Sequence, residues 1–474
     1  MARATHGRRG RTVVAILGSA IAILALGGAP AGAAAGACSA RDGSSGAWTS
    51  DLSAVLATAH TGDVIHIRGT CTGNFTVTVP LTLSGDLMAV LNGAGHGTVL
   101  TIDVPSGTVS IKTLEVTGGS APVGGGIAAD PGVSSSLTLS LLYARIIGNT
   151  AGTAGAGLDA GRIAALDITE SLFKDDTITP GSEGAEGAAI ASGAPGDFDL
   201  SNILSNAATA APGQTVTGGA VYLTARSTLY GMKIEDTTVS GGVIDGAGLG
   251  ATASVTVGDS TVEGNKATTS SGAIAGVGVY AAGPTAAIEH TATFGNIATS
   301  GSGAIEGTGV DAASSTALSF SGSSVGTNLA TTQSGLIRGV GVAGGGQDTL
   351  SDSGIVLNQG SSTTGTVDGG GIAPGGSLSM TGGMIDGNTV KSVSGLGDGG
   401  GIWTSVPASI SGAQVDDNSA STAGGGAYLA AGALTITGSQ FVGNTAPTGS
   451  AIDNVGGTVT ATDSLIDGSC VGCS

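Results

Sequence analysis

The sequence has 474 residues, of which 89 are glycine, 40% are hydrophobic and only 10% carry a charge. That apolar fraction is too high for a disordered chain, and the glycines follow no three-residue period, which excludes a collagen-like triple helix. The formal net charge of −19 excludes nucleic acid and anionic lipid as favourable partners. It suits solubility, calcium or a cationic partner.

Residues 1–37 have the pattern of a secretory signal peptide. Four arginines precede residue 12, residues 12–26 are apolar, and small residues with Ala-x-Ala cleavage sites follow up to Ala37. The apolar run is short for a membrane span, and no later segment offers one. We therefore expect a secreted, extracellular protein that is either free or associated with a cell wall. A weak twin-arginine signal and lipidation at Cys38 stay open as alternatives.

Four cysteines follow the signal peptide, and all of them lie near the ends of the chain. Cysteines in an exported protein favour disulfides. We predict one bridge between Cys38 and Cys71 and another between Cys470 and Cys473. A zinc or redox role for the CxxC motif at 470–473 is the alternative, but neither a second such motif nor a nearby histidine supports a metal site.

The strongest pattern in the chain is a hydrophobic residue, two variable residues and an asparagine, as in FVGN at 441–444. Asp176 and Thr237 take the asparagine position in two units. Successive members of the series lie 26 to 32 residues apart, which is the signature of a solenoid. The asparagines of the series are Asn149, Asn206, Asn265, Asn296, Asn328, Asn358, Asn388, Asn418 and Asn444.

A second pattern, GG or GxG followed by an apolar residue, precedes each asparagine. The interval from that apolar residue to the asparagine is 16 residues in most units, as from Val342 to Asn358. A fixed interval predicts a packed wall, and the variable interval after each asparagine predicts a surface loop. Within the wall, apolar and Thr or Ser residues alternate, as around Leu434 and Ile436, which predicts short strands with one face inward.

The first part of the chain differs from the repeats. Residues 48–59 have apolar residues at helical spacing, and residues 64–67 predict a strand. A short amphipathic helix there would cover the open end of the solenoid. We divide the mature chain into a cap with the first rungs (38–112), about eleven repeat rungs (113–468) and a cysteine-containing end (469–474).

The cap resembles that of right-handed parallel β-helix proteins of the pectin-lyase-like group. The repeats are similar to those of polymorphic outer-membrane proteins, which carry GGA(I/L/V) and FxxN; the counterparts here are GGAV at 218–221 and FVGN at 441–444. The resemblance implies an all-β, right-handed parallel β-helix. Those proteins end in a membrane β-barrel, whereas no run of alternating amphipathic strands follows the repeats here.

Two groups of residues are candidates for ligand chemistry. In the loops between rungs, one aligned position includes Asp245, Glu306, Arg338 and Asp368, which would form a charged column if the loops stack. Such a column fits sugar-acid binding or a polysaccharide lyase; the alternative is an exposed ladder of charges. The asparagine column itself is expected to be structural, each amide bonding to the next.

Acidic residues beside the asparagines are candidates for calcium binding. They include Asp175, Asp176, Asp416 and Asp417. Solvated turn carboxylates are the alternative. No other cofactor is expected, and we predict no catalytic residue because convergent carboxylate and base motifs are missing. Aromatic platforms for sugars are nearly absent, with Trp403 standing alone.

These patterns favour a non-catalytic, adhesin-like or structural protein that presents repeated surface loops on a rigid rod. Its expected partner is an extracellular polysaccharide or the surface of a host or neighbouring cell. A polysaccharide lyase or glycoside hydrolase with the same fold is the alternative.

Overall fold

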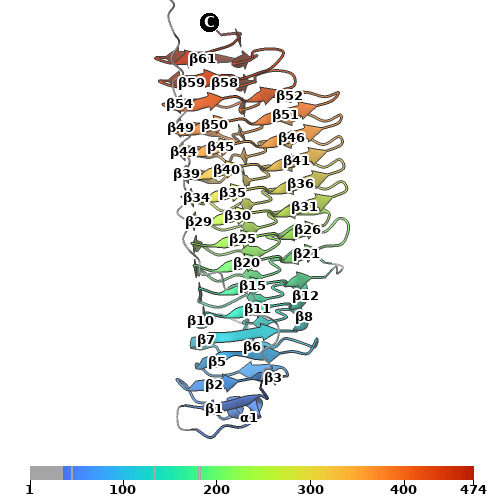
Figure 1. Ribbon diagram of the computed structural model, residues 1–474, viewed down its shortest axis with the longest axis vertical. Coiled ribbons are helices and arrows are strands. Elements are labelled where there is room, and N and C mark those ends of the chain that lie inside the picture. Colours follow the sequence, from blue (N-terminus) through green and yellow to red (C-terminus); the bar gives the residue numbers. More distant parts are fainter. Residues whose placement is uncertain (1–35, 44–45, 132–134, 180, 182, 474) are drawn as a thin grey trace, which may run out of the picture.

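The computed structural model of the chain is a parallel β-solenoid (Figure 1), as the repeats predicted. It describes residues 36–43, 46–131, 135–179, 181 and 183–473. The signal peptide lies almost entirely outside the described residues. Within them, successive turns stack in register, and only one helix interrupts the succession of short strands.

One turn from the middle of the rod shows the repeating unit. Each of its strands pairs in parallel with its counterpart in the next turn, which begins with β49 (Ser377–Thr381). The strands of this turn are β44 (Gln347–Ser351), β45 (Gly354–Val356), β46 (Gln359–Ser362), β47 (Val367–Asp368) and β48 (Ile372–Ala373).

Between Ala151 and Ala420 the turns enclose two separate hydrophobic cores. The rows that contain β44, β45 and β48 surround the main core, where Leu350, Ile355 and Ile372 are fully buried. The rows that contain β46 and β47 form a side lobe, seen on the right of Figure 1, with a smaller core of its own that includes Ile337 and Val367. The prediction of a surface loop after each asparagine is therefore wrong for most of that segment, which forms two stacked strands.

A turn made by a serine or threonine closes the tip of the side lobe. In five successive turns, its hydroxyl accepts a hydrogen bond from the backbone N–H of the glycine three residues later, as Ser362 does from Gly365 at 2.8 Å. A Cβ on Gly365 would lie 2.0 Å from the backbone oxygen of Gly335 in the previous turn. These two constraints explain why the segments TTSSG, TSGSG and TTQSG are near copies.

The asparagine column and the glycine pattern meet at the waist between the two cores. The amide of Asn358 donates to Asn388 Oδ1 at 2.9 Å and to the backbone oxygen of Val325 at 3.1 Å. On the opposite wall, a Cβ on Gly341 would lie 2.8 Å from Asn358 Nδ2. In most turns the waist is therefore narrow and an amide packs against a glycine, which accounts for the pairing of the two sequence patterns; in the turn of Asn206 the glycine is replaced by Ala189.

The two substitutions in the column fit the same geometry. Thr237, which is shorter than asparagine, lies in the turn whose waist glycine is replaced by Ala220, and its backbone N–H still donates to Asn265 Oδ1. Asp176 keeps the asparagine shape and accepts hydrogen bonds from the backbone and side chain of Asn149. The prediction that the column is a structural ladder is confirmed.

Adding a methyl group at the waist should destabilise the solenoid strongly. In Gly371→Ala the new Cβ would lie 2.5 Å from the backbone oxygen of Gly401 and 2.9 Å from Ile385 Cγ2. We expect a loss of about 1–3 kcal/mol in unfolding free energy, measured by urea unfolding followed by circular dichroism. The matched control is Gly354→Ala, whose Cβ would have no neighbour closer than 3.7 Å; equal losses in both variants would contradict the close contact at the waist.

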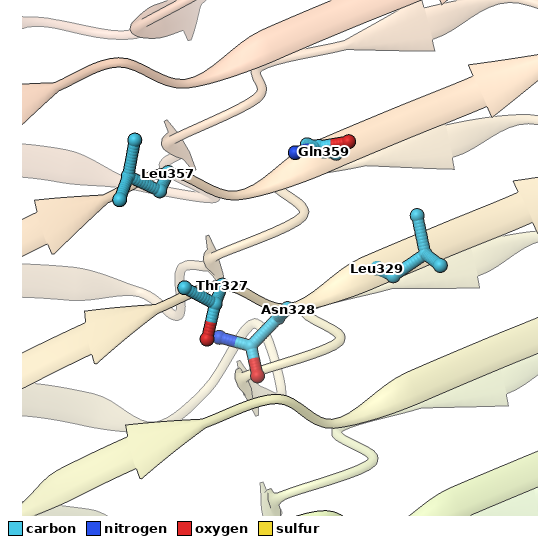
Figure 2. A pocket seen from close by; sticks show the side chains of 5 residues that line it. All are labelled: Thr327, Asn328, Leu329, Leu357 and Gln359. Carbon is cyan, nitrogen blue, oxygen red and sulfur yellow. The ribbon is translucent and has the colours of Figure 1, made fainter.

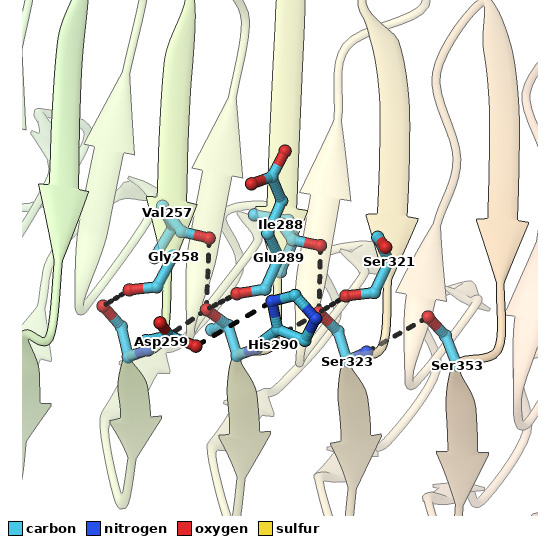
Figure 3. Close-up of polar contacts among 11 residues, drawn as sticks. Val257, Gly258, Asp259, Ile288, Glu289, His290, Ser321, Ser323 and Ser353 are labelled. Carbon is cyan, nitrogen blue, oxygen red and sulfur yellow. Dashed lines mark hydrogen bonds and ion pairs between the residues drawn. The ribbon is translucent and has the colours of Figure 1, made fainter.

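A second polar ladder, which the sequence analysis did not identify, runs along the rod within the main sheet and joins each turn to the next. The position five residues before each asparagine is serine or threonine in most turns, and its hydroxyl accepts a hydrogen bond from the backbone N–H of the preceding turn. Ser353, for example, accepts from Ser323 at 3.2 Å (Figure 3). The hydroxyl of Ser323 accepts a hydrogen bond from Thr291 N at 3.1 Å and donates one to the backbone oxygen of Ser321 at 3.0 Å. Its capacity both to accept and to donate is therefore used.

The N-terminal end is covered as expected. Asp51 caps α1 (Leu52–Ala57) by accepting from Ala54 N at 3.0 Å, and Leu52 and Leu56 are buried against the first turn. Strand β1 (Ser39–Asp42) runs antiparallel to β2 (Val64–Arg68). Disulfides join Cys38 to Cys71 and Cys470 to Cys473, which confirms both predicted bridges.

Candidate functional site: an acidic-aromatic strip along the rod

Two columns of outward side chains run side by side along the rod, one on the side lobe and one on the sheet that contains β48. We call them together the acidic-aromatic strip. The register of the turns gives the side-lobe column as Glu186, Thr217, Asp245, Ala275, Glu306, Arg338, Asp368 and Asp398. The second column comprises Asp159, Ala191, Tyr222, Gly250, Tyr280, Asp311, Ala343, Ala373, Trp403, Tyr428 and Asp453.

The structure brings the predicted charged column together. Glu306 pairs in register with Arg338, and Arg338 pairs with Asp368. Asp245 lies on the same column, separated from Glu306 by Ala275. All four candidate ligand-binding residues therefore share one line along the rod.

The sequence analysis missed the aromatic half of the strip. Four of the seven tryptophan and tyrosine residues of the chain lie in one column: Tyr222, Tyr280, Trp403 and Tyr428. Trp403 therefore does not stand alone. A signal was present, because all four occupy the position directly after the apolar residue of the glycine pattern, but an overall count of aromatics does not reveal it.

Charge is crowded where the two columns face each other. Burial raises the pKa of Asp311 well above its ordinary value, and the negative charges of Glu306 and Asp245 raise it further, whereas Arg338 lowers it. Burial also raises the pKa of Tyr280 to about 12, with Asp245 as the largest charge contribution. These couplings cross from one column to the other, so the side chains form one electrostatic unit.

The C-terminal half of the strip shows the same crowding. Burial raises the pKa of Asp368 to about 6, and Asp398 raises it further while Arg338 lowers it. Burial also raises the pKa of Asp398 to about 6, opposed by a hydrogen bond from the backbone of Ala423 and supported by the charge of Asp453. Near neutral pH these carboxyl groups are therefore mostly ionised but close to titration.

Arg338 is the one positively charged side chain in the two columns of the strip. Its guanidinium lies 4.9 Å from the centroid of the Trp403 ring, within the range of a cation–π contact. Trp403 lies two turns further along the rod, so the arginine reaches along the strip instead of pairing only with its neighbours in register. The strip thus already holds one positive group against an aromatic face.

At its N-terminal end the strip is hollowed into a small cavity of about 200 Å³. Its lining takes Glu186 from the side lobe and Asp159 and Tyr222 from the second column, together with Arg162. Burial raises the pKa of Asp159 to about 6, and the charges of Asp130 and Glu186 add to the effect. The two columns therefore form the walls of a concave surface at this point.

A second cavity, of about 290 Å³, lies at the corner between the main sheet and the side lobe (Figure 2). Leu329 and Leu357 line it together with Thr327, Asn328 and Gln359. The amide of Asn328 is already hydrogen-bonded to Thr293 and Asn358. Because this cavity is mainly apolar and gathers no ionisable group, it is a weaker candidate than the strip.

The structure separates the residues considered for calcium. Asp176 is fully buried in the ladder, and Asp416 accepts a hydrogen bond from the backbone of Val442 at 3.0 Å. Asp175 lies 3.4 Å from the amine of Lys174, whereas Asp417 lies at a corner with positive φ. Among the described residues, no three His, Cys, Asp or Glu side chains gather in a geometry that would hold a metal ion.

Comparisons with known proteins leave the site to be interpreted from its geometry. No protein-family profile, no curated protein and no solved structure matches the chain. In the part of the chain that the structure describes, no helix is long and apolar enough to cross a membrane.

Proposed function

We propose that the protein is a secreted or wall-associated, non-catalytic binding scaffold, adhesin-like in role, whose acidic-aromatic strip holds an extended polysaccharide. The observation that carries the proposal is the alignment of Tyr222, Tyr280, Trp403 and Tyr428 in one outward column beside a column of carboxylates. Aromatic faces offer sugar rings a flat apolar surface, and the neighbouring oxygens are acceptors for hydroxyl groups.

The geometry suits a long ligand. Tyr222 and Tyr280 lie two turns apart, with Gly250 in the turn between them. At ~4.8 Å per turn, this places them about 9.6 Å apart along the axis. The strip continues over many turns, whereas the cavity at its N-terminal end is small. The resemblance of the cap to the pectin-lyase-like group, and of the repeats to those of polymorphic outer-membrane proteins, is consistent with an extracellular polysaccharide as partner.

Removing aromatic faces from the strip should weaken polysaccharide binding. We expect the double variant Tyr280→Ala/Tyr428→Ala to bind about tenfold more weakly than the parent, measured by fluorescence titration against a panel of uronate, neutral and amino-sugar polysaccharides. In a Trp48→Phe background, Trp403 is the remaining tryptophan and reports on the strip directly.

The matched control is Tyr230→Ala, because Tyr230 is half exposed and lies on the main sheet away from the strip. This variant should bind as the parent does. Absence of binding to every polysaccharide in the panel, or equal weakening by the control, would contradict the proposed function.

A glycoside hydrolase is the second candidate, and one observation favours it. Glu306 is partly exposed while Asp311 is buried with a raised pKa, so the two carboxyl groups have different environments, as an acid and a nucleophile or base require. Release of reducing ends that is lost in Asp311→Asn and in Glu306→Gln would establish this alternative in place of the binding scaffold.

A further inference from the structure

We propose that the polysaccharide held by the strip is a linear chain of amino sugars with free, protonated amines. This inference rests on the proposed function and specifies the class of ligand. Its starting point is the charge of the strip. The two columns together contain eight carboxyl groups and one guanidinium, that of Arg338. The carboxyl groups belong to Asp159, Glu186, Asp245, Glu306, Asp311, Asp368, Asp398 and Asp453.

Asp398 shows that this charge is not fully compensated within the protein. Only 5% of the surface of this residue is exposed, and its Oδ1 has no hydrogen-bond partner. The backbone of Ala423 favours the charged form of the carboxyl group only in part, since burial still raises its pKa to about 6. An ionised carboxylate oxygen left without a donor is costly, and the positive charge of a ligand amine placed near Asp398, Asp453 and Tyr428 would offset its negative charge.

Arg338 indicates which kind of group the strip accepts. In register it lies between Glu306 and Asp368, and its guanidinium packs 4.9 Å from the Trp403 ring centroid. The protein itself thus places a cation between carboxylates and an aromatic face. The carboxylates beside Tyr222 share their cavity with Arg162. Those beside Tyr280 and Tyr428 have, apart from Arg338, no arginine or lysine within the two columns, and these positions offer the same surroundings to amines of a ligand.

The polymer is a sugar chain in preference to a basic peptide because the strip offers no strand edge. In the middle of the strip, the strands that the structure describes are paired on both sides, as β47 is with β42 (Ile337–Arg338) and β52 (Gly397–Asp398). An extended peptide could not add to the sheet there, and its backbone would gain no hydrogen bonds from it. A sugar chain needs no strand edge and gains from aromatic faces. Uronates, in contrast, would meet like charge.

The experiment compares ligands that differ in one feature. Isothermal titration of the full mature protein near neutral pH would use oligomers of equal length: glucosamine, N-acetylglucosamine, galacturonate and lysine. We expect the glucosamine oligomer to bind at least about tenfold more tightly than each of the others, and its affinity to fall as salt is added.

Variants locate the effect on the strip. Asp368→Asn/Asp398→Asn should weaken glucosamine binding about tenfold and narrow its advantage over the N-acetylated oligomer. Asp259→Asn is the matched control, because this exposed carboxyl group lies on the main sheet beside His290, at 3.8 Å (Figure 3), and its removal should change nothing. Circular dichroism melts identify any variant that fails to fold; Glu306→Gln, at a partly exposed position of the strip, then serves as the second test and should also weaken glucosamine binding.

The outcomes separate the two proposals. If N-acetylglucosamine or galacturonate binds as tightly as glucosamine, the amine specificity is wrong while polysaccharide binding stands. If oligolysine binds as tightly, charge alone determines affinity and the sugar class is overturned. If none of the sugars binds, the proposed function fails as well.

Discussion

Replacing Asn388 with alanine should lower the unfolding free energy by about 3–5 kcal/mol. The amide of Asn388 donates to the backbone oxygen of Ile355 at 2.8 Å and to Asn418 Oδ1 at 3.0 Å. Its own oxygen accepts from the backbone and the side chain of Asn358. The side chain is fully buried, so water cannot replace these bonds, and alanine would leave several buried polar groups without partners.

The measurement is the midpoint of urea unfolding followed by circular dichroism. Gln414→Ala is the control, because Gln414 is also a polar amide residue of the main sheet but its side chain is exposed to water. Asn388→Asp adds a test of mechanism: it keeps the shape but introduces an ionisable group, so it should destabilise less at acidic pH than at neutral pH. If Asn388→Ala unfolds at the same urea concentration as Gln414→Ala, the ladder does not contribute to stability.

The second large effect concerns Asp176, the carboxyl group within the same ladder. Burial raises the pKa of Asp176 well above 3.8, and the hydrogen bonds from Asn149 oppose this only in part. The protonated form fits the ladder best, because the OH of a neutral carboxyl group can act as the NH2 of asparagine does, and Oδ2 has no partner in the deprotonated form. The folded state therefore binds this proton more tightly than the unfolded chain does.

The sign of the pH dependence follows. The contribution of Asp176 to stability is complete below the unfolded pKa near 3.8 and is lost as pH rises through the folded pKa. Each unit between the two pKa values corresponds to about 1.4 kcal/mol. We expect Asp176→Asn to raise the thermal midpoint at neutral pH and to leave it little changed at acidic pH. Asp417→Asn, at the equivalent exposed position before Asn418, is the control; a midpoint that does not rise in Asp176→Asn would show that the carboxyl group is accommodated in its charged form.

The fold could be predicted because the repeat contains redundant information. Leu434, Ile436 and Phe441 point into the main core as their alternation indicated, and Asn444 takes the expected corner. The same pattern recurs in most turns, so an exception at one turn does not obscure it. The alignment of the charged position was predictable for the same reason, since stacked turns turn a sequence period into a spatial column.

The side lobe was not predicted because its core is small and its residues are weak strand formers. Ala298 and Ala330, for example, are fully buried there, yet alanine carries little periodic signal. The glycines at the tip indicate turns, but they do not indicate that strands flank them. The aromatic column was missed for another reason: single residues at one aligned position are visible only after the register of the turns is known.

The ladder has a direction, and this has an electrical consequence. From Asn265 to Asn444, every amide oxygen accepts from the turn before it, and in all but the last member the side-chain nitrogen donates to the turn after it. The amide dipoles are therefore parallel and polarise one another, as in a chain of hydrogen bonds. Thr237 interrupts the array, so the rod contains a long polarised segment and a short one. Loss of a central amide divides the long segment in two, whereas loss of Asn444 only shortens it.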